Sequence, residues 1–212
     1  SNSVSVGDVI TYQMHVVIPA GTEKCTLHDE MTGLAFNGNS IDPNSDIYLF
    51  DGDTTFKAGE HYNFTKTTNG FMLEFTEKYL KSTTVERQVL ISYNAILTKS
   101  AVMGNKGDAN TNDAWLTYGD KNTVSTHSPT KTYTFEFPVF KYTGNLENNP
   151  TALSGAEFKL YSDPTCQKEI KLAQTDKKNN YRKYITDDTE ANIVTDATGK
   201  FTISGLAEGT YY

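Results

Sequence analysis

The sequence predicts an all-β protein that consists of two tandem β-sandwich domains. Aromatic residues form 12% of the chain, and threonine and tyrosine are abundant, a composition that favours β-sheet. Short segments of alternating apolar and polar residues recur along the chain and are separated by turn residues, which is typical of a sandwich. No long segment shows the periodicity of an amphipathic helix.

The predicted strands of the first domain each place apolar residues on one face. In residues 9–18 every even position is apolar, and Pro19-Ala20-Gly21 ends this strand. The same alternation predicts further strands at residues 47–50, 71–75, 89–97 and 114–118. In the strand at 89–97 the apolar face consists of Val89, Ile91, Tyr93, Ala95 and Leu97.

A hydrophilic stretch at residues 119–131, which includes Pro129, predicts the boundary between the domains. The first domain is therefore expected at residues 1–131 and the second at residues 132–212. Within the second domain, residues 175–198 are polar and charged, and we interpret them as a long loop.

The net charge of −7 argues against a nucleic-acid partner, because phosphate binding requires a basic face. No apolar run is long enough to span a membrane and no signal peptide is present, so we interpret the chain as an excised fragment or a mature product. The distant Cys25 and Cys166 are interpreted as separate thiols rather than a disulfide.

A lysine interrupts the apolar face of the first strand in the second domain. In TFEFPVFKY the positions Phe135, Phe137, Val139 and Lys141 share one face, and the first three predict that this face points inward. A buried lysine is costly unless it is paired, neutralised or chemically consumed. The alternative is a lysine whose stem packs on the sheet while its amine reaches water.

The segments LSGAEFKLY (153–161) and TDATGKFTISGLAEGTYY (195–212) resemble the CnaB-type immunoglobulin-like domain of Gram-positive pilins and wall-anchored adhesins. The resemblance implies that Lys141 is the nucleophile of an isopeptide bond to an asparagine on the last strand, promoted by a glutamate. Both partners are expected beyond Tyr212, so the second domain is expected to be truncated at its C-terminus.

The segments VGDVITYQMHVVIPAG, LHDEMTGLAF, ISYNAIL and NTNDAWLTYGDKN, in this order, resemble the D2-type isopeptide-forming domain of fimbrial shaft proteins over residues 4–125. The resemblance implies that Asp29 is the assisting acid and that Asn112 is the acceptor. The family's lysine lies upstream of the VGD segment, whereas no lysine of this chain precedes Lys24.

Strand parity also places Asp29 and Asn112 on otherwise apolar faces, with Leu27 and Met31 in one strand and Ala114 and Leu116 in the other. Two alternatives remain open at this point. Asp29 can cap the turn that follows at Thr32-Gly33, and Asn110 shares the parity of Asn112 and is the rival acceptor.

These residue types suit one reaction. Burial favours the neutral amine of a lysine and the protonated form of a carboxyl group, and a protonated carboxyl can polarise the amide as ammonia leaves. The reaction turns over once per molecule, so the protein is not expected to be an enzyme. No cofactor or metal is predicted, because the histidines lack zinc-like spacing and Asp51-Gly52-Asp53 lacks the remaining spacing of a calcium loop.

The resemblance implies a structural subunit of a sortase-assembled pilus or a wall-anchored adhesin, extracellular and held on the pilus or the cell wall. Its expected partners are other pilin subunits or peptidoglycan. One alternative is a ligand-binding adhesin that recognises a host matrix protein or a glycan, and another is the stalk of a surface enzyme.

Overall fold

The computed structural model describes residues 2–38, 43–82, 84–119 and 123–212. It divides the chain into two compact units. The N-terminal sandwich comprises Val9–Thr98 and Asn110–Lys131, and the C-terminal unit comprises Ser1–Asp8, Lys99–Ala109 and Thr132–Tyr212. The predicted boundary at 131/132 is one of these divisions, whereas the two short segments predicted to lie in the first domain pack with the C-terminal unit.

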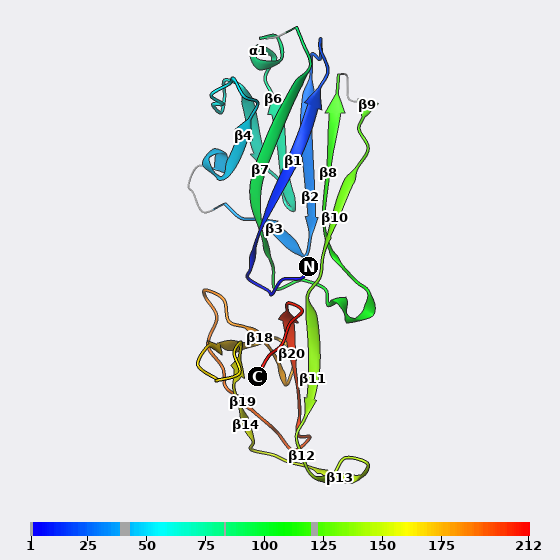
Figure 1. Ribbon diagram of the computed structural model, residues 1–212, viewed down its shortest axis with the longest axis vertical. Helices are drawn as coiled ribbons and strands as arrows, with labels where there is room; N and C mark the ends of the chain where they lie inside the picture. The colour runs from blue at the N-terminus through cyan, green and yellow to red at the C-terminus, as the bar shows by residue number, and fades with distance from the viewer. Residues whose placement is uncertain (1, 39–42, 83, 120–122) are drawn as a thin grey trace. The chain divides into compact units, whose positions relative to one another are not determined.

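The N-terminal sandwich is built from two sheets (Figure 1). The first sheet contains β1 (Val9–Ile18), β7 (Arg87–Leu97), β3 (Leu34–Phe36) and β4 (Ile47–Phe50), with β7 pairing all three others. The second has the order β10 (Ser128–Thr132), β8 (Asn110–Tyr118), β2 (Cys25–Thr32), β6 (Gly70–Phe75) and β5 (Tyr62–Lys66), and β9 (Thr123–Val124) pairs β8. The all-β prediction is confirmed.

Strand alternation builds the core of this sandwich. In β7 every second residue from Val89 to Leu97 is buried, and in β2 the same holds from Cys25 to Met31. Each large apolar side chain that leaves water contributes about 1.5–3 kcal/mol. Truncation of the fully buried Ile91 to alanine should therefore cost about 2–5 kcal/mol, since a cavity would remain.

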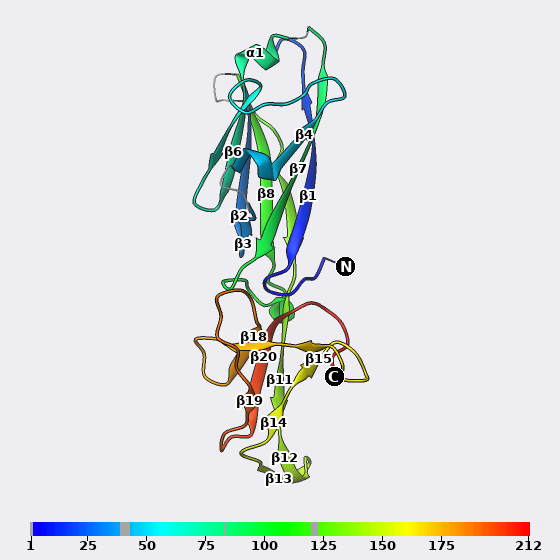
Figure 2. The same ribbon diagram turned by 90° about the vertical axis from the view of Figure 1, so that its left-hand side faces the viewer.

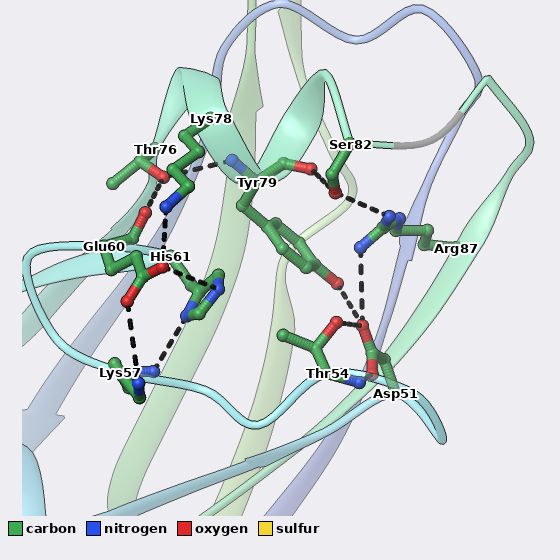
Figure 3. A network of polar contacts seen from close by, with 10 residues as sticks. All are labelled: Asp51, Thr54, Lys57, Glu60, His61, Thr76, Lys78, Tyr79, Ser82 and Arg87. Carbon is green, nitrogen blue, oxygen red and sulfur yellow. Dashed lines mark hydrogen bonds and ion pairs between the residues drawn. The ribbon is translucent and has the colours of Figure 1, made fainter.

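The sandwich also carries two short helices, η1 (Pro43–Asp46) and α1 (Glu77–Leu80). A polar network surrounds α1 (Figure 3). Thr76 caps α1 by accepting the backbone N–H of Tyr79. Asp51 accepts hydrogen bonds from the backbone N–H groups of Asp53 and Thr54, from the Thr54 hydroxyl and from the Tyr79 hydroxyl. The Asp51-Gly52-Asp53 segment is therefore a turn whose first carboxylate is occupied by protein donors.

The C-terminal unit contains a four-stranded sheet in the order β11-β20-β18-β17, in which β18 and β20 are parallel. Figure 2 labels β11, β18 and β20 of this sheet. Its strands are β11 (Phe135–Phe140), β20 (Lys200–Leu206), β18 (Asn180–Lys183) and β17 (Leu172–Gln174). Three two-stranded ribbons complete it: β12 (Tyr142–Asn145) with β13 (Asn148–Ala152), β14 (Glu157–Phe158) with β19 (Ile193–Val194), and β15 (Leu160–Tyr161) with β16 (Glu169–Ile170). Its core consists of Leu160, Leu172, Tyr181, Ile193, Phe201, Ile203 and Leu206.

The interpretation of residues 175–198 as a loop is wrong, because this segment contributes β18 and β19. Polar side chains fill buried positions of β18, and the hydropathy pattern therefore hides the strand. Asn180 accepts the Ser204 hydroxyl at 3.0 Å, and Arg182 forms a bidentate ion pair with Asp188 at 2.6 and 2.8 Å. Such pairing offsets the cost of burying polar groups.

Two segments distant in sequence complete the C-terminal unit. In the first, Val6 is buried and its N–H donates to the Gly205 carbonyl at 2.9 Å. Gly205 has φ +71°, and a Cβ there would lie 2.5 Å from Val6. In the second, which contains η2 (Gly104–Lys106), Lys99 donates to Asp188 at 2.7 Å. These contacts fix both segments on this unit.

Cys25 is buried, Cys166 is exposed, and both are free thiols. No helix among the described residues has the length and apolar character needed to cross a membrane.

Candidate functional site

The two sequence-predicted residues of the first domain lie on neighbouring strands and face the interior of the N-terminal sandwich. Asp29 is in β2 and Asn112 is in β8, and the antiparallel register places Asp29 opposite Ala114 and Asn112 opposite Met31. Asp29 is 1% exposed and Asn112 is 3% exposed. The parity prediction that both polar side chains occupy core positions is therefore confirmed.

Tyr93, on β7 of the opposite sheet, joins the two residues. Its hydroxyl donates to Oδ2 of Asp29 and accepts a hydrogen bond of 2.8 Å from Nδ2 of Asn112. Tyr93 is 2% exposed. The sequence pattern marked it only as a core residue; the signal that could have identified it is a hydroxyl on an apolar face opposite two buried polar side chains.

The Asp29 carboxyl group and the Asn112 amide each have one oxygen that lacks a hydrogen-bond partner among the described residues. Oδ1 of Asp29 and Oδ1 of Asn112 are buried and accept no hydrogen bond from the described residues. A buried polar atom that is left unpaired costs about 1–3 kcal/mol, so such atoms are rare in folded proteins. Two of them in one cluster indicate a site prepared for a further polar group.

The environment changes the acidity of the cluster. Burial raises the pKa of Asp29 from 3.8 to about 6, although the hydrogen bonds from Tyr93 and Asn112 oppose the shift. Burial also raises the pKa of the Tyr93 hydroxyl, and the neighbouring Asp29 charge adds to this increase. Asp29 can therefore hold a proton close to neutral pH, while Tyr93 stays protonated.

Aromatic rings surround the cluster. The Tyr93 ring packs against Phe71 with centroids 4.8 Å apart, Tyr12 stacks on it at 5.6 Å, and Phe36 lies at 6.4 Å. Apolar walls exclude water and strengthen the electrostatic interactions between the polar groups inside.

Asn110, the rival acceptor, is also fully buried. Its side chain packs on the turn at Gly33, where a Cβ would lie 1.9 Å from the Asn110 Oδ1 atom. The structure thus places Asn112 in the hydrogen-bond network of Tyr93 and places Asn110 against the β2–β3 turn. This turn also explains why Gly33, with φ +73°, is a glycine.

The expectation that Lys141 points inward is wrong, because its side chain is exposed. Pairing between β11 and β20 ends at Phe140, after a register shift between Phe135 and Phe137. Lys141 follows this end: its N–H donates to Gly199, and its carbonyl accepts from Leu153. The alternation that holds for Phe137 and Val139, which pack on the core, does not extend to it.

No group of three or more metal-ligating side chains occurs in the parts of the chain that the structure describes. The cluster instead offers a carboxyl group that can be protonated, a primary amide and a phenol in a dry interior. Such a set can polarise an amide carbonyl and move protons around it.

Comparisons with known proteins give one match to a family model and several matches to solved structures. Residues 142–212 match the family model of SpaA, described as a prealbumin-like fold domain. No curated protein matches the chain.

Several solved structures share the fold over nearly the whole chain. The pilus backbone protein RrgB of Streptococcus pneumoniae has a TM-score of 0.70 at 17% identity, with 99% of this chain and 83% of that chain covered. The pilus 2b backbone protein of group B streptococcus has a TM-score of 0.68 at 20% identity, covering 100% and 80%. The major pilin SpaD of Corynebacterium diphtheriae has a TM-score of 0.59 at 19% identity, covering 96% and 47%.

At these identities the likeness establishes the fold. The chain therefore has the fold of Gram-positive pilus backbone proteins, and its residues 142–212 match the SpaA family of prealbumin-like domains.

Proposed function

We propose that this chain is part of a structural subunit of a Gram-positive pilus or wall-anchored surface protein, and that its N-terminal sandwich closes an intramolecular isopeptide bond at Asn112 with the assistance of Asp29. One observation carries the proposal. The carboxyl and the amide that the reaction needs are buried on adjacent strands, and each keeps one oxygen that has no partner among the described residues.

The reaction follows from these groups. A neutral lysine amine attacks Cγ of Asn112, and Asp29 in its protonated form donates to the amide oxygen as charge develops there. The new Nζ–Cγ bond forms, the Cγ–Nδ2 bond breaks, and Nδ2 leaves as ammonia after it takes up a proton that originates on the amine. Asp29 ends in the state in which it began, so nothing else is consumed.

The amine comes from sequence upstream of Ser1 in this proposal, as the resemblance to D2-type domains implies. The described lysines of the N-terminal sandwich are all exposed, and no lysine of the chain precedes Lys24. The resemblance to CnaB-type domains implies the corresponding role for Lys141 in the C-terminal unit, with an asparagine and a glutamate as its partners. An added strand beside β11 would have to cover Lys141, whose side chain is exposed here.

The product of this reaction is mechanical. A bond between distant strands closes most of a domain into one covalent loop, which by analogy with disulfides contributes several kcal/mol to stability. It also prevents a pulling force from separating the strands it joins. This suits an extracellular fibre whose subunits are joined end to end by sortase, with other pilin subunits or peptidoglycan as partners.

Intact-mass measurement of the parent polypeptide, extended upstream of Ser1 through the nearest lysine, tests the proposal. We expect a mass lower than the sequence mass by one ammonia, and the full sequence mass in the Asn112→Ala and Asp29→Ala variants. Asn110→Ala is the matched control and should retain the ammonia loss. A parent polypeptide that has its full sequence mass would overturn the proposal.

A further inference from the structure

The hydroxyl of Tyr93 joins the two sheets at this cluster through two hydrogen bonds, and both go to groups that would take part in the reaction. Asp29 and Asn112 belong to one sheet, whereas Tyr93 belongs to the other. The phenol therefore holds two reacting groups of one sheet from the opposite side of the core.

The direction of these bonds determines which atoms stay available. Because the Tyr93 oxygen accepts from Nδ2 of Asn112, the amide is oriented with its leaving nitrogen toward Tyr93 and its Oδ1 away from it. Because the Tyr93 hydroxyl donates to Oδ2 of Asp29, a proton on the carboxyl group belongs on Oδ1. The two atoms left over are the two buried oxygens for which the described part of the chain offers no hydrogen-bond partner.

We propose that Tyr93 is a positioning residue of the isopeptide site, which fixes the rotamer of the Asn112 amide and directs the acidic proton of Asp29 to Oδ1. This inference rests on the proposed function. Tyr93 presents Nδ2 as the leaving group and keeps Oδ1 of Asn112 free to accept the Asp29 proton, so the amine meets an amide that is already oriented. Tyr93 is neither consumed nor altered in the reaction.

Tyr93 also accounts for the choice between the two asparagines. Asn112 is held by the phenol, whereas the Asn110 side chain is packed on Gly33. A reaction at Cγ requires the amide to be held in one orientation next to the acid, because a small misplacement costs a large part of the rate.

Tyr93→Phe tests the inference, since it removes the hydroxyl and leaves the ring packed against Phe71 and Tyr12. Tyr79→Phe is the matched control. Tyr79 is fully buried in the same sandwich, and its hydroxyl also donates to an aspartate, Asp51, at 2.8 Å. Both variants are made in the parent polypeptide extended upstream of Ser1, synthesised cell-free, and followed by intact mass over time.

We expect ammonia loss to slow by about tenfold or more in Tyr93→Phe, as the loss of an orienting hydrogen bond implies, and to stay unchanged in Tyr79→Phe. Circular dichroism and thermal unfolding of both variants distinguish a slow reaction from a failure to fold. If Tyr93→Phe does not fold, Tyr93→Trp and Tyr93→His are compared, and only a variant that restores a polar hydrogen at the site should recover the rate.

The pH profile separates positioning from a merely structural role. The Tyr93 hydrogen bond lowers the pKa of Asp29, so its removal should shift the upper pH limit of the reaction to higher pH. Equal rates and equal pH limits in Tyr93→Phe and the unsubstituted protein would overturn the role of Tyr93 and leave the isopeptide intact. Absence of ammonia loss in the unsubstituted protein would overturn the proposed function itself.

Discussion

Two buried tyrosines of the N-terminal sandwich each donate a hydrogen bond to an aspartate, yet the pKa values of the two aspartates are shifted in opposite directions. Tyr79 donates to Asp51 at the α1 corner, and Tyr93 donates to Asp29 in the centre of the core. Burial acts to raise the pKa of both carboxyl groups. At Asp51 the hydrogen bonds prevail and the pKa falls to about 2, whereas at Asp29 it rises to about 6.

The two pKa values differ because the two carboxyl groups have different hydrogen-bond donors in addition to the tyrosine. Asp51 also accepts from two backbone N–H groups and the Thr54 hydroxyl, and Arg87 lies at 3.5 Å (Figure 3). Asp29 retains an oxygen with no partner among the described residues. A buried carboxylate with several donors is a structural element that stays charged, and one with few donors is prepared for proton transfer.

The largest effect is expected when the structural carboxylate is removed. Asp51→Ala leaves the Tyr79 hydroxyl, the turn N–H groups and Arg87 without their acceptor, and should lower the free energy of unfolding by about 3–5 kcal/mol. Urea unfolding followed by the fluorescence of Trp115, the single tryptophan and a residue of this sandwich, measures it. A loss below about 1 kcal/mol would show that the corner network contributes little.

Asp29→Asn should act in the opposite direction above neutral pH. The folded-state pKa of about 6 exceeds the ordinary value of 3.8, so the folded chain binds more protons between these values, and stability falls as pH rises through this window. The shift corresponds to roughly 3 kcal/mol, fully lost above about pH 7. Asp29→Asn removes the penalty, so the 212-residue variant should be more stable than the unsubstituted chain at pH 8 and about equal to it near pH 3.

That comparison uses the difference between the two proteins at each pH, because Asp51 and other carboxyl groups with lowered pKa values destabilise both proteins as pH falls. Parallel stability curves for the two proteins between pH 4 and pH 7 would contradict the raised pKa of Asp29.

Removing one hydroxyl at a time sharpens the comparison of the two pairs. In Tyr93→Phe the Asp29 pKa should rise further, since a principal donor is lost, whereas in Tyr79→Phe the remaining donors should hold the Asp51 pKa low. Each variant should lose about 0.5–1.5 kcal/mol of stability at neutral pH. Carboxyl-carbon NMR titrations of both variants give the two pKa values, and equal displacements would refute the argument from donor number.

The smallest effect is expected at a partly exposed carboxylate. Asp113 contacts His127 at 2.6 Å, and the side chains are 32% and 50% exposed. Water screens such a pair, so Asp113→Asn should change the free energy of unfolding by less than about 1 kcal/mol, and less still at high salt. A larger, salt-independent loss would show that Asp113 has a buried structural role as well.

Parity along strands predicted much of this molecule. It identified the core of β7 and the two polar residues Asp29 and Asn112, because β-strands alternate strictly and both residues lie in the middle of well-paired strands. The same argument failed at Lys141, which lies just past the last paired residue of β11. Parity therefore predicts the direction of a side chain only where the residues before and after it are both paired with a neighbouring strand.

Contacts between segments that are distant in the sequence could not be predicted from the strand pattern. Nothing in the alternation of β7 distinguishes Tyr93 from its apolar neighbours, since its role depends on two strands of the other sheet. For the same reason, the hydrophilic stretch at 119–131 indicated one division, while the assignment of Ser1–Asp8 and Lys99–Ala109 to the C-terminal unit depends on partners such as Gly205 and Asp188.

The C-terminal unit is assembled from three stretches of chain, so the chain passes four times between the two units, at 8/9, 98/99, 109/110 and 131/132. A gene fragment that begins at Thr132 would encode this unit without the Val6 segment that packs on Gly205 and without Lys99, which pairs with Asp188 in addition to Arg182. An exchange of this unit between related proteins would also have to transfer Ser1–Asp8 and Lys99–Ala109, which are encoded elsewhere in the gene. Recombination at 131/132 alone would separate these two segments from the rest of the unit.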